Sequence, residues 1–421
     1  MTTQQAARET LGINGLGRIG KLTLWHHVAR KHFPRIALNL GREVGRNLEA
    51  VCHSIEKDST YGSMHRFLFG VNAEPCIQIV DRDKGLLDVA GTEVAVLQKA
   101  RDPKAIAWRE QGARLVVDTT GAFTDPTVAA GEGKGSLRGH LAAGAEKVIN
   151  SSAFKIKDQS RSIPEDATTL IYGINHEAFN PEQHQVISAA SCTTTALAHM
   201  VKPVLDHLHE SSVMTASMST VHAATNSQSV LDTLPKSGAK DLRKNRSVLN
   251  NIILTSTNAA RALEQVIPQI RSIGFMADSV RIPTPTTSLI ILNLTFQSRM
   301  EPDGRSNIRR DVLNGIYQAA AEGPQKGLLI YTEEQNVPAE LTGMRAAVVL
   351  EAAETHTRTG FVDVDLASVP GLDPATIQAL GSPRVEVPVT HAKIFGWYDN
   401  EYGSYTNLMG DLTVHVHQRL D

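Results

Sequence analysis

Cys192 and His222 are the two residues whose types and settings most favour covalent chemistry. Cys192 lies between HQVISAAS and TTTALAHMVKPVLDHL, so a strand, a turn and a helix should place its sulfur at a helix N-terminus. The partial positive charge there lowers the pKa of a thiol toward the reactive thiolate. His222, in STVHAAT on an expected strand that enters a polar loop, could pair with this thiolate or act as its base. The alternatives are a small buried cysteine and, among 16 histidines, a structural one.

The other two cysteines, Cys52 and Cys76, do not show the combination of a helix N-terminus with a histidine partner. Three cysteines without a C-x-x-C pair argue against a disulfide framework and against a thiolate zinc site, so we expect no metal. We predict that Cys192 is the only fast-reacting thiol of the chain.

Gly15, Gly17 and Gly20 form a G-x-G-x-x-G pattern directly after an expected strand and at the start of an expected helix. Such glycines allow a tight turn, the close approach of a pyrophosphate and close packing of the helix on the strand. We therefore predict a dinucleotide site that includes Arg18 and Ile19 of the same turn. The alternative is a glycine turn with a purely structural role.

Leu40 lies about 20 residues downstream, where an acidic side chain normally accepts hydrogen bonds from the adenosine ribose. Leucine accepts none, and Arg42 offers positive charge where a 2′-phosphate would lie, so the cofactor is NAD, NADP or both. The alternative is that Glu43 or backbone groups hold the ribose and that Arg42 is merely solvated.

The elements that must position these residues fall into two groups. In the N-terminal half, short apolar runs alternate with longer amphipathic stretches; the apolar runs are LGIN, RIALNL, ARLVVDTTG, AEKVINSS, TLIYGIN and HQVISAA, and the first amphipathic stretch is IGKLTLWHHVARKHF. This order predicts an α/β fold with a doubly wound parallel sheet of the Rossmann type. After about residue 210, the runs SVMTASMSTVHAA and SVRIPTPTTSLIILNLTF predict a mainly antiparallel sheet in an α+β domain. Helices in AARALEQVI and NIRRDVLNGIYQAAAE should cover one face of it.

We therefore expect a nucleotide-binding domain over residues 1–190, completed by 401–421, and a catalytic domain over 191–400. Three segments resemble insertions and should be surface excursions, namely 131–139, 154–167 and about 336–386. The first contains GEGKGS, but Gly135 follows Lys134 where a Walker phosphate loop needs Ser or Thr, so we reject that motif.

Composition excludes several functional classes. The 421 residues carry 42 Lys and Arg against 44 Asp and Glu, so the net charge of −2 provides no general attraction for nucleic acid or anionic lipid. No apolar run approaches the roughly 18 residues of a membrane helix. The start MTTQQAARET has no basic leader or apolar core, and we expect a cytoplasmic protein.

Six segments that follow NGLGRIG carry a family resemblance: SAASCTTTALAHM, STVHAATNSQSVLDTLP, NNIILTSTNAARALEQVIPQ, VRIPTPTTS, KGLLIYTEEQ and WYDNEYG. In this order the chain resembles phosphorylating glyceraldehyde-3-phosphate dehydrogenases of a long bacterial type, over nearly its whole length apart from the insertions. The resemblance implies a homotetramer in glycolysis or gluconeogenesis.

The resemblance also implies residue roles. Cys192 would add to the aldehyde as a hemithioacetal, His222 would take the hydroxyl proton as hydride leaves, and inorganic phosphate would attack the resulting thioester. Thr225 and Arg281 would hold the substrate phosphate, and Ser191, Thr193 and Thr257 would line the inorganic phosphate site. Asn400 would orient the nicotinamide, and Thr119 and Phe123 would flank the cofactor.

Several positions depart from the family pattern. Ala189 replaces the usual Asn before the nucleophile segment, Thr195-Ala196 replaces Asn-Cys, and Asn258 replaces Gly, which puts the inorganic phosphate pocket in doubt. Leu40 replaces the acid of NAD-specific members, whereas Leu234-Pro235 resembles their loop, so we expect use of both NAD and NADP. The alternatives are an erythrose-4-phosphate dehydrogenase and a nucleotide-binding pseudoenzyme with an interaction role.

Overall fold

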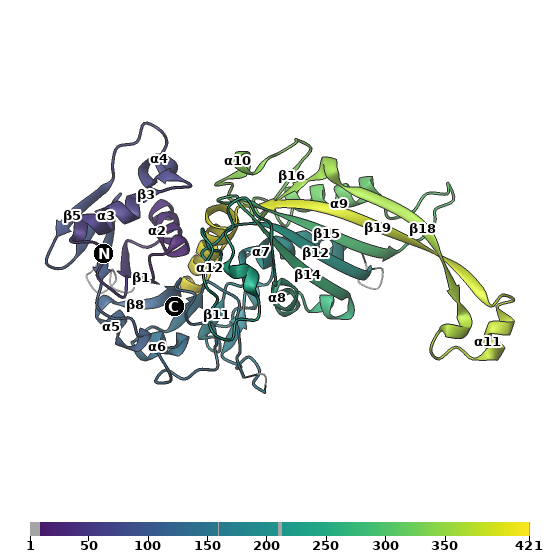
Figure 1. The fold of residues 1–421 in the computed structure, drawn as a ribbon, viewed down its shortest axis with the longest axis horizontal. Coiled ribbons are helices and arrows are strands. Elements are labelled where there is room, and N and C mark those ends of the chain that lie inside the picture. The colour runs from purple at the N-terminus through teal and green to yellow at the C-terminus, as the bar shows by residue number, and fades with distance from the viewer. Residues whose placement is uncertain (1–8, 159, 209–212, 421) are drawn as a thin grey trace.

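The computed structural model describes residues 9–158, 160–208 and 213–420, which form two large sheets side by side (Figure 1). Most of the N-terminal stretch on which the expectation about a leader depends lies outside the described residues. Among the described residues, no helix has both the length and the apolar character needed to cross a membrane.

The first sheet has nine strands in the order β10-β11-β9-β8-β1-β2-β7-β6-β5. Its strands are β1 (Thr10–Asn14), β2 (Arg35–Asn39), β5 (Ile77–Asp81), β6 (Leu86–Val89), β7 (Thr92–Leu97), β8 (Ala113–Asp118), β9 (Lys147–Asn150), β10 (Ala167–Thr169) and β11 (Val186–Ser188). All neighbours from β10 to β7 pair in parallel, as predicted, but β5, β6 and β7 add an antiparallel edge. Only the first residue of the run TLIYGIN, Thr169, belongs to a strand. The last four residues of the run form a turn.

Helices cover both faces of this sheet. They are α2 (Arg18–Arg30), α3 (Leu48–Glu56), α4 (Met64–Phe69), α5 (Trp108–Gln111) and α6 (Leu137–Ala142), and a small hairpin pairs β3 (Lys57–Asp58) with β4 (Gly62–Ser63). Leu11 and Ile13 of β1 pack with α2 in one buried cluster, whereas Trp108 and Val116 belong to a cluster on the other side. Buried clusters on both faces of the sheet are expected for the doubly wound arrangement.

The second sheet is mainly antiparallel. Its strands are β12 (Val213–Ala223), β13 (Ile253–Thr255), β14 (Gly274–Ile282), β15 (Ser288–Gln297), β16 (Leu329–Thr332), β17 (Val348–Glu351), β18 (His356–Asp365) and β19 (Arg384–Tyr398). Its order is β13-β14-β12-β15-β19-β17-β16, with β18 paired to β19. β12 and β14 run parallel, and this register sets His222 directly opposite Arg281.

Three helices form a single buried core with one face of the second sheet, namely α7 (Cys192–His207), α8 (Ala259–Val266) and α9 (Arg310–Glu322). The sequence predicted this role for α8 and α9, but not for α7. The spacing of the apolar residues in α9 explains this packing, since Leu313, Ile316, Tyr317 and Ala320 are buried and lie on one side of the helix. Two further short helices are α10 (Pro338–Leu341) and α11 (Pro374–Ala379), and 3-10 helices lie at Pro103–Ala105, His176–Ala178, Leu242–Asn245, Pro268–Ser272, Ala352–Glu354 and Leu366–Ser368.

The prediction of three surface excursions is only partly right. Residues 131–135 and most of 154–166 are on the surface, but residues 137–139 begin α6, and Leu137 is fully buried against the first sheet. Within 336–386, β17 lies inside the second sheet between β16 and β19, with Val348 and Leu350 in the core. Only the hairpin formed by the outer parts of β18 and β19, with α11 near its tip, extends away from both sheets (Figure 1).

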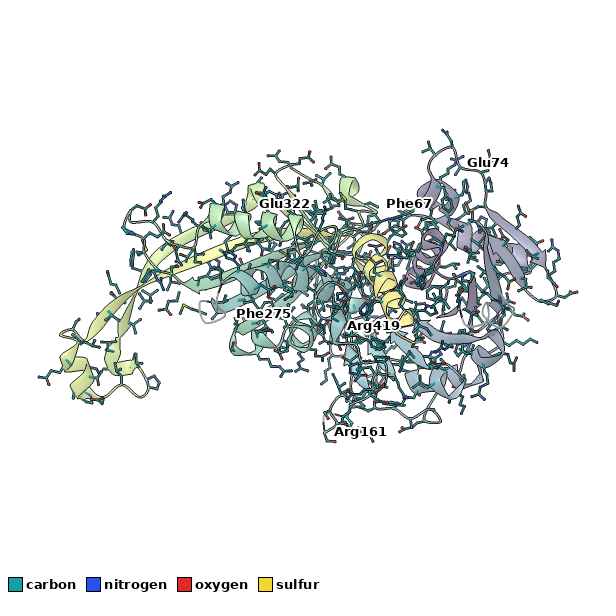
Figure 2. All side chains as sticks on the ribbon, turned by 180° about the vertical axis from the view of Figure 1, so that it is seen from behind. Phe67, Glu74, Arg161, Phe275, Glu322 and Arg419 are labelled. Atoms are coloured by element: carbon teal, nitrogen blue, oxygen red, sulfur yellow. The ribbon has the colours of Figure 1, made fainter. Side chains whose placement is uncertain are left out.

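The C-terminal segment returns to the first sheet. A π-helical turn (Tyr402–Thr406) leads into α12 (Asn407–His417), and Tyr402, Met409 and Leu412 pack in the same cluster as α2. Figure 2 shows α12 from behind, in yellow, crossing between the two halves of the molecule. The Asp399 carboxylate accepts hydrogen bonds from the Tyr61 hydroxyl (2.8 Å) and from Gly343 N–H (2.7 Å), which connects the two domains directly.

Candidate active site

Cys192 is the first residue of α7, as the sequence predicts. Strand β11 ends at Ser188, and the chain turns through Ala190, which adopts a left-handed φ of 55° although it is fully buried. Ser191 caps the helix, since its Oγ accepts a hydrogen bond from Thr194 N–H at 3.2 Å. This turn and cap fix the position of the Cys192 sulfur at the helix N-terminus.

The structure brings His222 to Cys192. The Cys192 Sγ and His222 Nε2 atoms are 3.5 Å apart, within reach of a sulfur hydrogen bond. His222 Nδ1 lies 2.7 Å from the carbonyl oxygen of Ala223 and also contacts the Arg281 guanidinium. The Ala223 carbonyl can only accept, so it favours a proton on Nδ1 and leaves Nε2 as an acceptor that faces the thiol. The Arg281 guanidinium can only donate, so it favours the opposite tautomer.

The pKa of Cys192 differs from the expectation based on the helix N-terminus alone. Burial raises the pKa of Cys192 above the ordinary thiol value, and the charge of Arg281 offsets only part of this effect. Burial and then the charge of Arg281 lower the pKa of His222 to about 3. The resting pair is therefore a neutral thiol beside a neutral imidazole, so the predicted thiolate requires transfer of the thiol proton to His222.

A second layer of hydrogen bonds supports this pair. The hydroxyl of Tyr398 lies 2.9 Å from Thr193 Oγ1 and 2.8 Å from Thr220 Oγ1, which connects α7, β12 and β19. Ser288 Oγ accepts from Ala223 N–H at 3.0 Å and donates to Asn400 Oδ1 at 3.0 Å. Asn400 is thereby tied to the strand that carries His222.

Only some of the predicted phosphate ligands lie close to the Cys192–His222 pair. Ser191, Thr193 and Arg281 adjoin the Cys192–His222 pair, but Thr193 is buried and its hydroxyl is engaged by Tyr398. Thr225 bonds to Ser227 and Gln228 in the loop after β12, and Thr257 accepts from Ala259 N–H before α8. No hydrogen bond among the described residues joins these two threonines to the pair.

Two buried donors near Arg281 have no partner. The Nε atom of Arg281 and the Oγ1 atom of Thr284 make no hydrogen bond within the described part of the chain. Such atoms are rare in folded proteins and fit a polar ligand. Thr284 was not singled out from the sequence, although it follows Arg281 closely in VRIPTPT.

Two of the three glycines of the nucleotide motif have the predicted backbone roles. Gly15 has a φ of 105°, and a Cβ on Gly20 would lie 2.1 Å from the Gly15 carbonyl oxygen, so these two permit the turn and the close packing of α2. A Cβ on Gly17 would meet nothing within 4 Å, which leaves open space at the helix N-terminus. The N-cap of α2 is Gly17, which has no side chain to cap the helix. The N–H groups at this end of α2 are therefore available to a pyrophosphate.

The other predicted cofactor residues shape this turn. The Thr119 hydroxyl donates to Asn14 O at 2.9 Å, and the Ile19 side chain is packed against the core. The Arg18 guanidinium is engaged by Glu401, with an Nε to Oε1 distance of 3.1 Å, and by Asp58. Arg18 therefore has its backbone N–H, rather than its side chain, to offer to a cofactor.

A cleft of about 1010 Å³ continues from this turn along the carboxyl ends of β1, β2 and β8. Leu40, Gly41, Arg42 and Phe123 line it, whereas Glu43 lines the neighbouring depression. The open turn, the uncapped helix and the cleft together fit an extended dinucleotide. The alternative in which Glu43 holds the ribose has no support from this geometry.

A buried polar network underneath the cleft was missed in the sequence. The Asp118 carboxylate accepts from Asn14 Nδ2 (2.8 Å), His140 Nε2 (2.9 Å) and the hydroxyl of Thr120 (2.7 Å), and Trp108 Nε1 donates to His140 Nδ1 (2.9 Å). Burial raises the pKa of Asp118, but these bonds outweigh it and lower the pKa below the ordinary value. The network holds together the ends of β1 and β8 from which the glycine turn begins.

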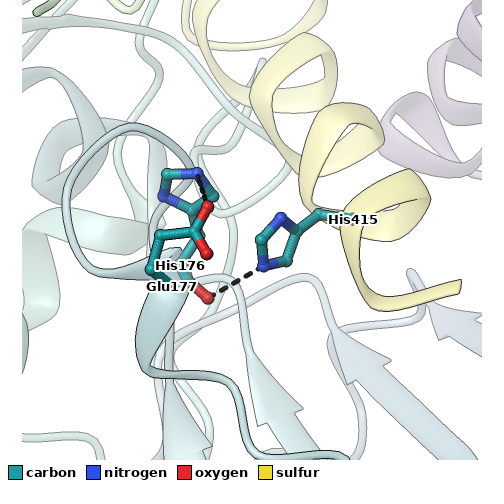
Figure 3. Close-up of side chains that lie close together, drawn as sticks. All are labelled: His176, Glu177 and His415. Atoms are coloured by element: carbon teal, nitrogen blue, oxygen red, sulfur yellow. Dashed lines mark hydrogen bonds and ion pairs between the residues drawn. The ribbon is translucent and has the colours of Figure 1, made fainter. Parts of the chain in front are cut away.

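His176, Glu177 and His415 form the one group of metal-ligand residues that the described residues bring together (Figure 3). His176 Nδ1 accepts from Gly173 N–H at 3.0 Å, so its Nε2 carries the proton and points to Glu177. His415 Nε2 donates to the His176 carbonyl oxygen at 3.0 Å, and the Arg419 guanidinium contacts both His415 Nδ1 and Glu177. These contacts satisfy the group as a hydrogen-bonded link between α12 and the 3-10 helix at His176–Ala178.

Comparison with known proteins gives a consistent result. The family model for the NAD-binding domain of glyceraldehyde 3-phosphate dehydrogenase matches residues 9–126, and the model for the C-terminal domain of the same enzyme matches residues 191–365. Glyceraldehyde-3-phosphate dehydrogenase of Streptomyces coelicolor is 31% identical over 97% of this chain and 99% of its own length. Glyceraldehyde-3-phosphate dehydrogenase 1 of Streptomyces avermitilis is 33% identical over 96% and 98%, and the enzyme of Geobacillus stearothermophilus is 31% identical over 96% and 97%.

Proposed function

The chain belongs to the glyceraldehyde-3-phosphate dehydrogenase family, and we propose that Cys192 and His222 carry its reaction. It is an NAD-dependent oxidoreductase that acts on the aldehyde of glyceraldehyde 3-phosphate. The observation that supports the assignment of the pair is the 3.5 Å distance between Cys192 Sγ and His222 Nε2 at the N-terminus of α7. The altered residues Ala189, Thr195 and Ala196 leave this geometry in place.

The chemistry of the pair accounts for each proton. His222 Nε2 takes the thiol proton as Cys192 Sγ bonds to the aldehyde carbon, and the carbonyl oxygen receives that proton to give a hemithioacetal. His222 then removes the hydroxyl proton as the carbon–hydrogen bond breaks, which leaves a thioester on Cys192. A bound NAD supplies the acceptor for this hydride. Inorganic phosphate displaces the sulfur to form 1,3-bisphosphoglycerate, and His222 returns the proton to the thiolate.

The polar groups around the pair hold the phosphates in this proposal. Arg281 offers its unpartnered Nε, and Thr225 offers a hydroxyl from the loop after β12, to the substrate phosphate. Ser191, Thr193 and Thr257 line the inorganic phosphate site at the ends of α7 and α8. Tyr398 already engages the Thr193 hydroxyl, so the backbone N–H of Thr193 is the better donor to the inorganic phosphate.

The cofactor is held by the turn of Gly15, Gly17 and Gly20 together with the backbone of Arg18 and Ile19. Leu40 and Arg42 line the adenosine end, Thr119 supports the turn, and Asn400 orients the nicotinamide. In this assignment residues 1–190 and 401–421 form the nucleotide-binding domain and residues 191–400 the catalytic domain.

We further propose a cytoplasmic homotetramer. The face of the second sheet opposite α7 exposes apolar side chains, among them Met276 at 70%, and Leu234 in the loop after β12 is 93% exposed. Apolar exposure of this kind fits an interface between copies of the chain.

The experiment that tests the proposed chemistry is turnover of glyceraldehyde 3-phosphate with NAD, with and without phosphate, followed by mass spectrometry of the peptide that contains Cys192. We expect an acyl adduct on Cys192 when phosphate is omitted and its discharge when phosphate is added. Cys192→Ser should abolish turnover, and His222→Asn should lower it by roughly 10²–10⁴. Cys52→Ser and Cys76→Ser are the matched controls, and erythrose 4-phosphate in parallel measures the selectivity for the triose.

A further inference from the structure

The cleft at the adenosine end of the cofactor site is lined by residues from two parts of the chain. The first part supplies Leu40, Gly41 and Arg42 after β2 and Arg101 after β7. The second part supplies Lys134, Lys157 and Arg161 from the segments 131–139 and 154–167. Both segments lie within residues 127–190, which neither family model matches.

The close approach of Gly135 to two side chains holds the segment 131–139 against the cleft. A Cβ on Gly135, where φ is 117°, would lie 2.7 Å from Pro103 and 2.9 Å from the ring of Phe123, so only glycine allows this approach. Lys134 precedes Gly135, and Arg101 lies two residues before Pro103. The Gly135–Pro103 contact thus brings Lys134 and Arg101 to the same end of the cleft.

The segment 154–167 is anchored next to it. Lys155 N–H donates to Thr124 O at 2.8 Å, and Lys157 N–H donates to Asp125 Oδ2 at 3.0 Å. Both acceptors directly follow Phe123 in the chain. These bonds fix the backbone from which Lys157 extends.

Positive charge exceeds negative charge in the cleft, with five cationic and three acidic side chains in its lining. Each acid already has partners: Asp125 accepts from Lys157 and Thr127, Glu132 accepts from Ala129 N–H, and Asp158 pairs with Arg161. Among the described residues, no hydrogen bond or ion pair engages the side chains of Arg42, Lys134 or Lys157. Arg101 donates through Nε to Gly41 O at 3.2 Å, which directs its guanidinium toward the loop after Leu40.

We propose that the segments 131–139 and 154–167 complete a binding site for the 2′-phosphate of NADP, in which Lys134 and Lys157 join Arg42 and Arg101 in the lining of one cleft. A phosphate dianion is bound best by several converging cations, and Leu40 places no carboxylate there to repel it. The inference rests on the proposed function, because it assigns the cofactor of the same site. It also gives the two segments a role as specificity determinants.

Calorimetric titration with 2′,5′-ADP and with 5′-AMP tests this inference without the nicotinamide. These probes share the adenosine and differ in the 2′-phosphate. We expect the wild-type protein to bind 2′,5′-ADP at least about tenfold more tightly. The double variant Lys134→Ala/Lys157→Ala should reduce that preference to below about threefold while keeping its affinity for 5′-AMP. The matched control Lys84→Ala/Lys155→Ala removes two lysines of the same domain that do not line the cleft and should keep the preference.

Equal affinity of the wild type for both probes would overturn the inference, and so would an unchanged preference in the double variant. Loss of 5′-AMP binding in the double variant would also overturn it, since the lysines would then support the whole adenosine site. Turnover of glyceraldehyde 3-phosphate with NAD by the same preparation separates the two proposals. Turnover without a preference for 2′,5′-ADP leaves the proposed function in place, whereas absence of turnover with NAD and with NADP contradicts the proposed function itself.

Discussion

At the scale of single residues, Cys192 shows two opposing effects on one thiol. The N-terminus of α7 and the Arg281 guanidinium favour the thiolate, whereas burial favours the neutral thiol and outweighs them in the resting protein. His222 has a pKa of about 3 and is therefore an unprotonated base beside the sulfur at neutral pH. In the proposed reaction, the nucleophile is therefore generated by transfer of the thiol proton to His222 when an aldehyde binds.

Arg281→Ala should slow alkylation of Cys192 by iodoacetamide near neutral pH. The charge of Arg281 lowers the thiol pKa, so its removal raises that pKa and reduces the thiolate fraction, by about tenfold for each unit of the rise. The rate is measured by mass spectrometry of the Cys192 peptide as a function of pH. Arg281→Lys keeps the charge and should keep most of the rate, and identical rates in the wild type and the alanine variant would show that Arg281 has no electrostatic effect on the sulfur.

The same residue should distinguish a phosphorylated substrate from an unphosphorylated one. Arg281→Ala should weaken kcat/KM for glyceraldehyde 3-phosphate far more than for glyceraldehyde, because a charge-assisted bond to phosphate contributes about 1.5–3 kcal/mol. Steady-state kinetics on both aldehydes give the ratio, with the exposed Arg271→Ala as a control. Equal losses on the two substrates would assign Arg281 to the support of His222 instead.

At the scale of elements, the sequence predicted those parts whose signals are local. The glycine pattern placed the turn before α2, and the apolar spacing placed α8 and α9 correctly. The parallel pairing of β12 with β14 and the Asp118–His140 bond could not be predicted, because they depend on contacts between residues far apart in the chain. The prediction that the segment 336–386 is a surface excursion was wrong for a physical reason. Its proline content is typical of loops, yet β17 within it is buried by its neighbours in the sheet.

The outer hairpin of β18 and β19 should contribute little to the stability of a single chain. Phe361 is 58% exposed, Val362 50% and Leu380 57%, so this segment buries few apolar groups against the two sheets. Replacing residues 362–387 by Asn-Gly, which suits a tight turn between Phe361 and Pro388, should change the free energy of unfolding by less than about 1 kcal/mol. Urea denaturation followed by circular dichroism provides the measurement. A loss of several kcal/mol would mean that the hairpin is part of the folding core.

At the scale of the whole molecule, several histidines are enclosed in the interior as neutral rings. His26, His27, His199 and His222 are all at most 2% exposed. Burial lowers the pKa of His27 and His222 to about 3 and that of His199 to about 4, and it lowers the pKa of His26 well below the ordinary value. Both ring nitrogens of His27 also lack a hydrogen-bond partner among the described residues. These buried neutral rings make the free energy of unfolding depend on pH.

The protein should lose stability as the pH falls from about 6.5 toward 5, before most carboxylates titrate. In this range the unfolded chain binds protons on these histidines and the folded chain does not. Each such ring therefore lowers the free energy of unfolding by about 1.4 kcal/mol per pH unit once it is protonated in the unfolded chain. Urea denaturation at several pH values measures how the free energy of unfolding changes with pH. His27→Leu should reduce this slope by the equivalent of up to one proton. His53→Leu, at an exposed histidine, is the control. Because the leucine removes two unsatisfied buried nitrogens, the variant should also be at least as stable as the wild type near neutral pH. A slope that His27→Leu leaves unchanged would mean that this ring takes up its proton while the chain is folded, and the acid sensitivity would then have to originate at other groups.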